Sequence, residues 1–214
     1  MSRWLVLDLD GTLVDSVPDL AAALNRLMQR RDLAAFSQAE VTAMVGDGVR
    51  ALVERGFAAR GAAMDEAALD AFLIDYTANA AVGSRAYPGV TATLEALRGQ
   101  GWTMAVCTNK PEAPARALLA ALGLDGFFAA VGGGDSFPVR KPNPAHLTAT
   151  LAACNGDPAR TVMVGDHHND IHAAAGAGVA SIWARWGYGA GVTGAAAEAD
   201  AFTDLPGILA RLMP

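Results

Sequence analysis

Short apolar runs alternate with longer segments of helical period along most of the 214-residue chain. Runs of three to five mostly apolar residues are typical of buried strands, and they are expected at 4–7, 104–107, 129–131, 161–164 and 179–183. The other segments of this part predict helices at about 90–99, 111–122, 144–154, 171–177 and 205–212. Strands that alternate with helices of this length predict an α/β fold: a doubly wound parallel sheet with right-handed crossovers, or Rossmann-like core.

One long helical stretch interrupts this alternation soon after the first strand. Residues 18–31 place Leu20, Leu24 and Leu27 along one face, and residues 66–77 are again typical of a helix. No strand candidate occurs between residues 17 and 85. About 60 to 70 residues of helix between two sheet elements predict an inserted α-helical cap. We expect a core of residues 1–15 and 86–214, a cap of residues 16–85, and hinges at 15–18 and 81–88.

Composition and charge narrow the class of protein. The net charge of −6 and the pI near 5.1 disfavour a nucleic-acid surface, which is normally basic. No apolar stretch approaches the roughly 20 residues of a membrane span, and no basic-then-apolar leader precedes the first strand. Cys107 and Cys154 are isolated, as is typical of buried thiols in a reducing compartment. We therefore expect a cytoplasmic protein, a monomer or homodimer, that binds neither nucleic acid nor a membrane.

Two aspartates, Asp8 and Asp10, stand directly after the first predicted strand and before Gly11. The C-terminal ends of parallel strands hold the ligands of open α/β sheets, and glycine permits a sharp turn close to a ligand. Clustered carboxylates repel each other unless a cation lies between them, and oxygen ligands of this kind suit Mg²⁺. A carboxylate can also be the nucleophile that forms an aspartyl-phosphate. The alternative is an acidic turn that ends a strand and caps the next helix.

Two later segments could hold an anion such as a phosphate. Thr108 and Asn109 end a predicted strand, and Pro111 opens the next helix, so a hydroxyl and backbone N–H groups converge there. The alternative is that Thr108 and Asn109 only cap that helix. Lys141 stands between Arg140 and a Pro-x-Pro segment, a rigid support that would present its ammonium to an aspartate and a phosphoryl group. The alternative for Lys141 is a solvated turn, and Arg140 is expected at the surface.

Two more aspartates, Asp166 and Asp170, follow a later predicted strand. We expect both to bind Mg²⁺, Asp170 either directly or by orienting another ligand. The histidines next to them raise the question of a zinc site. Adjacent histidines such as His167 and His168 are expected to point in different directions, and His168 and His172 have no evident third ligand. A zinc site is therefore not expected.

These four segments, in this order and each at the end of a predicted strand, resemble the motifs of the haloacid dehalogenase superfamily of phosphohydrolases. The first motif of that family is Asp-x-Asp-Gly-Thr-Leu/Val, and residues 8–13 match it in full. The resemblance implies that Asp8 is the nucleophile and Asp10 the general acid/base, both close to Mg²⁺. The second aspartate also argues for phosphoryl transfer, because the dehalogenating branch lacks it.

The remaining motifs of the family are a serine or threonine, a lysine before proline, and Gly-Asp-x-x-x-Asp. The resemblance implies that Thr108 and Lys141 hold the phosphoryl group. It also implies a Mg²⁺ site made by four residues, Asp8, Asp10 through its backbone carbonyl, Asp166 and Asp170. His167 departs from the serine that often follows the first aspartate of the last motif, which leaves open one hydrogen-bond partner of the metal site.

Within this superfamily the chain looks most like the phosphoglycolate phosphatases, which implies a small phosphorylated metabolite, 2-phosphoglycolate, as the substrate. The alternatives are a sugar phosphomutase of the same fold, a phosphatase for another sugar phosphate or for pyrophosphate, and a non-catalytic phosphate-binding domain. Thr12 and Asn109 are expected to contact the substrate. Arg50 follows the turn 46–48 between two cap helices, where its guanidinium could meet a substrate carboxylate. The alternative is a tight turn with Arg50 in solvent.

Overall fold

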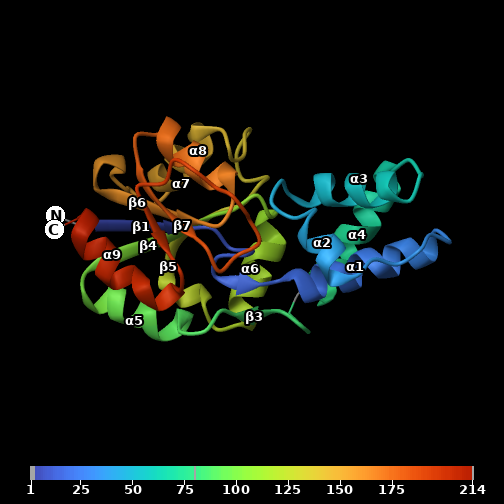
Figure 1. The fold of residues 1–214 in the computed structure, drawn as a ribbon, viewed down its shortest axis with the longest axis horizontal. Coiled ribbons are helices and arrows are strands. Elements are labelled where there is room, and N and C mark those ends of the chain that lie inside the picture. The colour runs from blue at the N-terminus through green and yellow to red at the C-terminus, as the bar shows by residue number, and fades with distance from the viewer. Residues whose placement is uncertain (1–2, 80, 214) are drawn as a thin grey trace.

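A six-stranded parallel sheet forms the centre of the larger of two lobes, at the left of Figure 1. The computed structural model describes residues 3–79 and 81–213. The strands lie in the order β5-β4-β1-β6-β7-β8. Their bounds are β1 Arg3–Leu7, β4 Trp102–Cys107, β5 Phe128–Gly132, β6 Thr161–Gly165, β7 Ala180–Ala184 and β8 Ala197–Ala199. After β1 the chain adds β4 and β5 on one side of it, and then β6, β7 and β8 on the other side. Where the order of addition switches, between β1 and β6, a doubly wound sheet has a crevice at the carboxyl ends of its strands.

Alternating side chains of each strand face two separate layers of helices. Leu5 and Leu7 pack in one apolar cluster, whereas Trp4 and Val6 pack in the other, as the two-residue period of a strand requires. The first cluster includes residues of α5 Val90–Gly99, α6 Glu112–Ala121 and α9 Leu205–Leu212, and the second includes residues of α7 Pro144–Ala152 and α8 His168–Gly176. Helices on both faces of a parallel sheet confirm the predicted doubly wound α/β fold.

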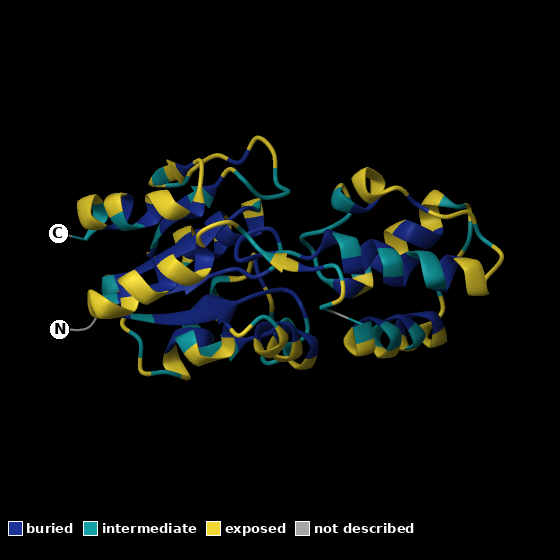
Figure 2. Ribbon diagram, turned by 90° about the horizontal axis from the view of Figure 1, so that it is seen from below, coloured by how far each residue is buried: buried dark blue, intermediate teal, exposed yellow. Residues whose placement is uncertain are grey.

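Four helices with an apolar interior of their own form the cap, at the right of Figure 1. They are α1 Val17–Arg30, α2 Gln38–Thr42, α3 Val49–Ala59 and α4 Glu66–Asn79. Leu24, Val53 and Phe72 meet in this interior, which is distinct from the two clusters of the sheet. Figure 2 shows the same separation as two lobes, each with buried segments inside and exposed helix faces outside. The predicted helical insertion is thus confirmed.

A short antiparallel ribbon joins the cap to the core. It pairs β2 Val14–Asp15 with β3 Arg85–Ala86. Next to it, the buried carboxylate of Asp19 accepts hydrogen bonds from the backbone N–H of Gly83 at 2.7 Å and from the N–H and hydroxyl of Ser84 at 2.8 and 2.7 Å. The predicted domain boundaries, which stay a prediction, fall at this ribbon.

Two further expectations concern membranes and thiols. In the part of the chain that the structure describes, no helix has both the length and the apolar character needed to cross a bilayer. Cys107 is a buried free thiol in β4, and Cys154 is a half-buried free thiol after α7. Burial raises the pKa of the Cys107 thiol to about 12, so this side chain behaves as a small apolar residue.

Candidate active site

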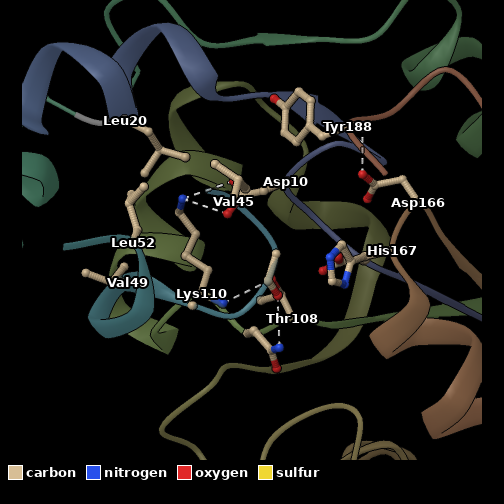
Figure 3. Close-up of a pocket in the computed structure, with 14 residues that line it drawn as sticks. Asp10, Leu20, Val45, Val49, Leu52, Thr108, Lys110, Asp166, His167 and Tyr188 are labelled. Atoms are coloured by element: carbon tan, nitrogen blue, oxygen red, sulfur yellow. Dashed lines mark hydrogen bonds and ion pairs between the residues drawn. The ribbon is translucent and has the colours of Figure 1, made fainter. Parts of the chain in front are cut away.

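A cavity lies between the carboxyl ends of the sheet strands and the cap (Figure 3). Its polar wall comes from loops of the core, with Asp8, Asp10, Thr108, Asn109, Lys110, Asp166, His167 and Tyr188. Its largely apolar wall comes from the cap, with Leu20, Val45, Gly46, Gly48, Val49 and Leu52. The core therefore supplies the polar and charged side chains of the cavity, and the cap supplies its apolar side chains.

Three buried carboxylates converge beside this cavity. Asp8, Asp166 and Asp170 each offer an oxygen within 4.8 Å of the others. Burial raises the pKa of Asp8 to about 6, although the nearby Lys141 opposes this shift. Burial, together with the charges of Asp8 and Asp170, raises the pKa of Asp166 to about 8. An all-oxygen set of three crowded carboxylates fits a hard divalent cation such as Mg²⁺, which would offset their mutual repulsion.

Asp166 is fixed by three donors from distant parts of the chain. Its Oδ1 accepts a hydrogen bond from the hydroxyl of Thr12 at 3.1 Å, and its Oδ2 accepts from the backbone N–H groups of Tyr188 and Gly189 at 2.8 and 3.3 Å. Thr12, predicted to contact substrate, is fully buried and points to Asp166. Gly11 adopts φ +82°, and a Cβ there would come within 2.4 Å of Asp166 Oδ2.

Lys141 is the counter-charge within this group of carboxylates. Its Nζ lies 2.9 Å from Asp8 Oδ1 and 2.5 Å from Asp170 Oδ1, and its side chain is 1% exposed. Burial opposes the charge of the ammonium, but Asp170 and Asp8 outweigh it and raise the pKa of Lys141. The loop is held by His146, whose Nδ1 accepts a hydrogen bond from the Lys141 backbone N–H at 3.1 Å. The structure thus brings Lys141 to an aspartate, Asp8, as expected from the rigid segment that carries it.

Thr108 and Asn109 occupy the loop after β4, but in different roles. Thr108 is nearly fully buried and lines the cavity, and its hydroxyl accepts a hydrogen bond from the Lys110 backbone N–H at 3.2 Å. The amide of Asn109 donates to the carbonyl of Lys141 at 3.0 Å and to the carbonyl of Gly46 at 3.1 Å. Asn169, at the start of α8, donates to the same Gly46 carbonyl at 3.3 Å. Asn109 therefore joins two core loops to the cap.

Asp10 is paired with Lys110, a residue for which the sequence predicted no role. Lys110 Nζ lies 3.0 and 3.1 Å from the two carboxylate oxygens of Asp10 and 2.5 Å from the hydroxyl of Tyr76 in α4. Burial opposes the Lys110 charge, but Asp10 and Tyr76 outweigh it and raise the pKa of Lys110. The Asp10 side chain is outside the cluster of three carboxylates, so only its backbone carbonyl remains a predicted Mg²⁺ ligand. The one signal in the sequence was a lysine directly after Thr108-Asn109.

The two adjacent histidines do not diverge. The ring centroids of His167 and His168 are 3.9 Å apart, because His167 is the extended N-cap residue of α8 and His168 is its first residue. Both offer a nitrogen within 4.8 Å of each other and of a carboxylate oxygen of Asp47, from the cap. Asp47 also accepts a hydrogen bond from Asn169 at 2.8 Å and pairs with Arg55. The predicted divergence is wrong, and the third possible ligand lies far away in the sequence.

Arg50 lies outside the cavity. Its guanidinium donates to both carboxylate oxygens of Glu66 at 2.8 Å, and its side chain is 43% exposed. Gly48 and Val49, which precede it, do line the cavity. The turn before α3 therefore reaches the site as expected, whereas Arg50 points to another helix of the cap.

Comparison with known proteins places the chain in a family. Residues 3–178 match the haloacid dehalogenase-like hydrolase model. The chain is 43% identical to a phosphoglycolate phosphatase of Agrobacterium fabrum over 192 residues. This alignment covers 88% of this chain and 82% of the relative. The chain is 44% identical over 188 residues to one of Caulobacter vibrioides, in an alignment that covers 86% and 79%.

Solved structures agree with this assignment. A crystal structure of a predicted phosphoglycolate phosphatase from Haemophilus somnus matches with a TM-score of 0.90 at 33% identity, over 97% of both chains. A structure of CbbY from Rhodobacter sphaeroides with xylulose-(1,5)bisphosphate matches with a TM-score of 0.78 at 21% identity over 96% of both chains, which shows the fold alone. The chain belongs to the haloacid dehalogenase-like hydrolases, as a phosphoric monoester hydrolase similar to the phosphoglycolate phosphatases.

Proposed function

We propose that the protein is a Mg²⁺-dependent phosphatase that hydrolyses a small phosphomonoester, 2-phosphoglycolate, through an aspartyl-phosphate on Asp8. The observation that carries this proposal is the position of Asp8. Its carboxylate lines the cavity, lies 2.9 Å from the ammonium of Lys141, and belongs to the cluster of buried carboxylates. A carboxylate beside a buried cation can approach a phosphate dianion that it would otherwise repel.

In the proposed first half-reaction, a carboxylate oxygen of Asp8 attacks phosphorus while the bond from phosphorus to the ester oxygen breaks. Asp10, protonated for this step, gives its proton to the departing alkoxide. Thr108 and Lys141 hold the non-bridging oxygens through a hydroxyl and an ammonium. When bound by Asp8, Asp166 and Asp170, Mg²⁺ supplies positive charge that offsets the crowding of phosphate and carboxylates.

In the second half-reaction, Asp10 takes a proton from water, and the oxygen of that water attacks phosphorus. The bond from phosphorus to Asp8 breaks, so inorganic phosphate leaves and the carboxylate is restored. Asp10 ends protonated and is ready for the next ester. The apolar cap wall over this site would keep other water away during the first half-reaction.

The cap side of the cavity offers little hydrogen bonding to a sugar. The cap contributes Leu20, Val49 and Leu52 to the lining, and none of these side chains can hydrogen-bond to sugar hydroxyls. Sugar hydroxyls that face this wall would lack partners there, at a cost in binding. The names of the relatives at 43 and 44% identity support 2-phosphoglycolate as the substrate.

The test is the variant Asp8→Asn, assayed with 2-phosphoglycolate and p-nitrophenyl phosphate in the presence of Mg²⁺. We expect the wild-type protein to hydrolyse both esters. The variant should lose at least about 10³-fold in kcat because an amide is a poor nucleophile. Circular dichroism and thermal unfolding would show that the fold is retained. Retention of a few per cent of activity by a preparation free of contaminating phosphatase would remove Asp8 from the nucleophile role.

A further inference from the structure

The charges in the cavity are unevenly distributed. Three aspartates line it, and the described cap residues of the lining carry no charged side chain. Lys110 is the one lysine or arginine among the described lining residues. Lys141, the other buried lysine, is already paired with Asp8 and Asp170. A second anionic group on the substrate, besides its phosphate, therefore has one place in this cavity where a full positive charge can meet it.

Lys110 lies beside the position that the proposed function gives to the leaving alcohol. Its Nζ is 3.0 Å from Asp10, the residue proposed to protonate the ester oxygen of that alcohol. Figure 3 shows the ammonium on the side of Asp10 that faces Leu20 and Leu52 of the cap. A substituent one or two bonds beyond the ester oxygen would thus come between Asp10 and the apolar wall, next to Lys110.

Both lobes hold this ammonium in place. Tyr76, a fully buried residue of the cap, places its hydroxyl 2.5 Å from Lys110 Nζ and its ring centroid 4.4 Å from it. The Lys110 ammonium contacts both carboxylate oxygens of Asp10. One of these contacts is enough to keep the two residues paired, so another N–H of the ammonium can donate to a substrate carboxylate. The side chain is 1% exposed, which makes any ion pair formed there little screened by solvent.

We propose that Lys110 is the specificity-determining residue that recognises a carboxylate bonded directly to the ester carbon of the leaving alcohol. The inference rests on the proposed function, and it gives to Lys110 the role first considered for Arg50. A carboxylate against Leu20 and Leu52 would be strongly disfavoured without a cation, because buried charges need a partner. An ester that bears an ammonium at the same position would be repelled by Lys110.

The experiment compares three phosphate esters that share a two-carbon alcohol: 2-phosphoglycolate with a carboxylate, ethyl phosphate with a methyl group, and phosphoethanolamine with an ammonium. The quantity measured is the kcat/KM of each charged ester divided by that of ethyl phosphate. In Lys110→Met the ratio for 2-phosphoglycolate should fall by roughly 30-fold or more, mainly through KM, as expected for a buried charge that loses its partner. The ratio for phosphoethanolamine should rise.

Three further proteins serve as controls. Lys110→Arg keeps the charge and should keep most of the wild-type preference. Arg116→Met removes one positive charge from an exposed site on α6, where Arg116 pairs with Glu112, and should keep the wild-type ratios. Arg50→Ala tests the competing assignment. A collapse of the 2-phosphoglycolate ratio in Arg50→Ala, but not in Lys110→Met, would overturn the role of Lys110.

The outcomes separate this inference from the proposed function. A wild-type enzyme with no preference for 2-phosphoglycolate over ethyl phosphate would overturn both. A wild-type preference that persists within threefold in Lys110→Met, or a loss that is equal for all three esters, would leave the function and reject carboxylate recognition by Lys110. If the Lys110 variants do not fold, the wild-type enzyme still decides: a faster turnover of phosphoethanolamine than of ethyl phosphate would reject the proposal.

Discussion

His146 is a buried residue whose neutral form the fold requires. Its Nδ1 accepts a hydrogen bond from the Lys141 backbone N–H, and its Nε2 lies 3.0 Å from the carbonyl oxygen of Gly133. Burial, with the charge of Lys141 adding to it, lowers the pKa of His146 from 6.5 to about 4. Between these two values the unfolded chain binds a proton that the folded protein does not. His146 should therefore destabilise the fold progressively as the pH falls from 6.5 to 4.

The loss assigned to His146 should reach about 2 kcal/mol at pH 4.5. It can be measured as the free energy of unfolding in urea at pH 7.5 and 4.5, for the wild type and for His146→Gln. Between pH 7.5 and 4.5 the variant should lose about 2 kcal/mol less of its free energy of unfolding than the wild type does, because glutamine does not titrate. Asp8 and Asp166, with raised pKa values, contribute in the opposite direction and are common to both proteins. Identical pH profiles would show that His146 takes up its proton in the folded state.

At the residue scale, the sequence was enough to predict site residues that belong to a recognisable motif. It was not enough to predict contacts between residues that are far apart in the chain. Asp8, Lys141 and Asp166 were predicted from residue type and place, and the structure brings all three together. Lys110 and Asp10 are 100 positions apart, and Tyr188 reaches Asp166 from 22 positions away. Such pairs form because the order of strands in the sheet brings distant segments together, and a pattern within one segment cannot predict that order.

The hinge ribbon depends on one carboxylate at the start of α1. Asp19 accepts three hydrogen bonds from Gly83 and Ser84, and it is 5% exposed. Replacement by alanine leaves those donors buried without an acceptor, so Asp19→Ala should lower the free energy of unfolding by about 2 to 3 kcal/mol. Urea denaturation measures the change. Glu95→Ala, an exposed change on α5, is the control and should cost less than about 0.5 kcal/mol. An equally small effect of Asp19→Ala would mean that water replaces this carboxylate without penalty.

At the element scale, predicted and observed segments agree where an element is long enough to show a period. The helix expected at 18–31 is observed as α1 Val17–Arg30, and the helix expected at 66–77 as α4 Glu66–Asn79. The strands β2, β3 and β8 were not predicted. They contain two, two and three residues, and their existence depends on a partner strand and not on their own pattern.

The molecule as a whole should be more stable with a divalent cation. Three carboxylates share one buried site in the folded protein and separate when the chain unfolds, so the proposed Mg²⁺ should bind the folded state selectively. Saturating Mg²⁺ should raise Tm by roughly 5 to 10 °C over the EDTA-treated protein. EDTA should also abolish phosphatase activity, and Mg²⁺ should restore it. Differential scanning fluorimetry and a phosphate-release assay provide both readings.

A different metal response would point to different residues. Restoration by Zn²⁺ and not by Mg²⁺, with no rise in Tm on adding Mg²⁺, would contradict the hard-cation site. The metal would then be assigned to the second group of possible ligands, Asp47, His167 and His168. Because Asp47 belongs to the cap and the histidines to the core, such a site would exist only with the two lobes together.

The separate interior of the cap has a consequence for how this protein can diverge. A cluster of buried apolar residues among those described stabilises the cap helices independently of the sheet clusters, while the proposed nucleophile, acid and metal ligands all belong to the core. Substitutions that reshape the cap wall can therefore accumulate without disturbing the carboxylates below it. The shape of the cap wall can thus change while the proposed reaction chemistry of the core is kept. The exception is the contact between Lys110 of the core and Tyr76 of the cap, where a change in one lobe requires a change in the other.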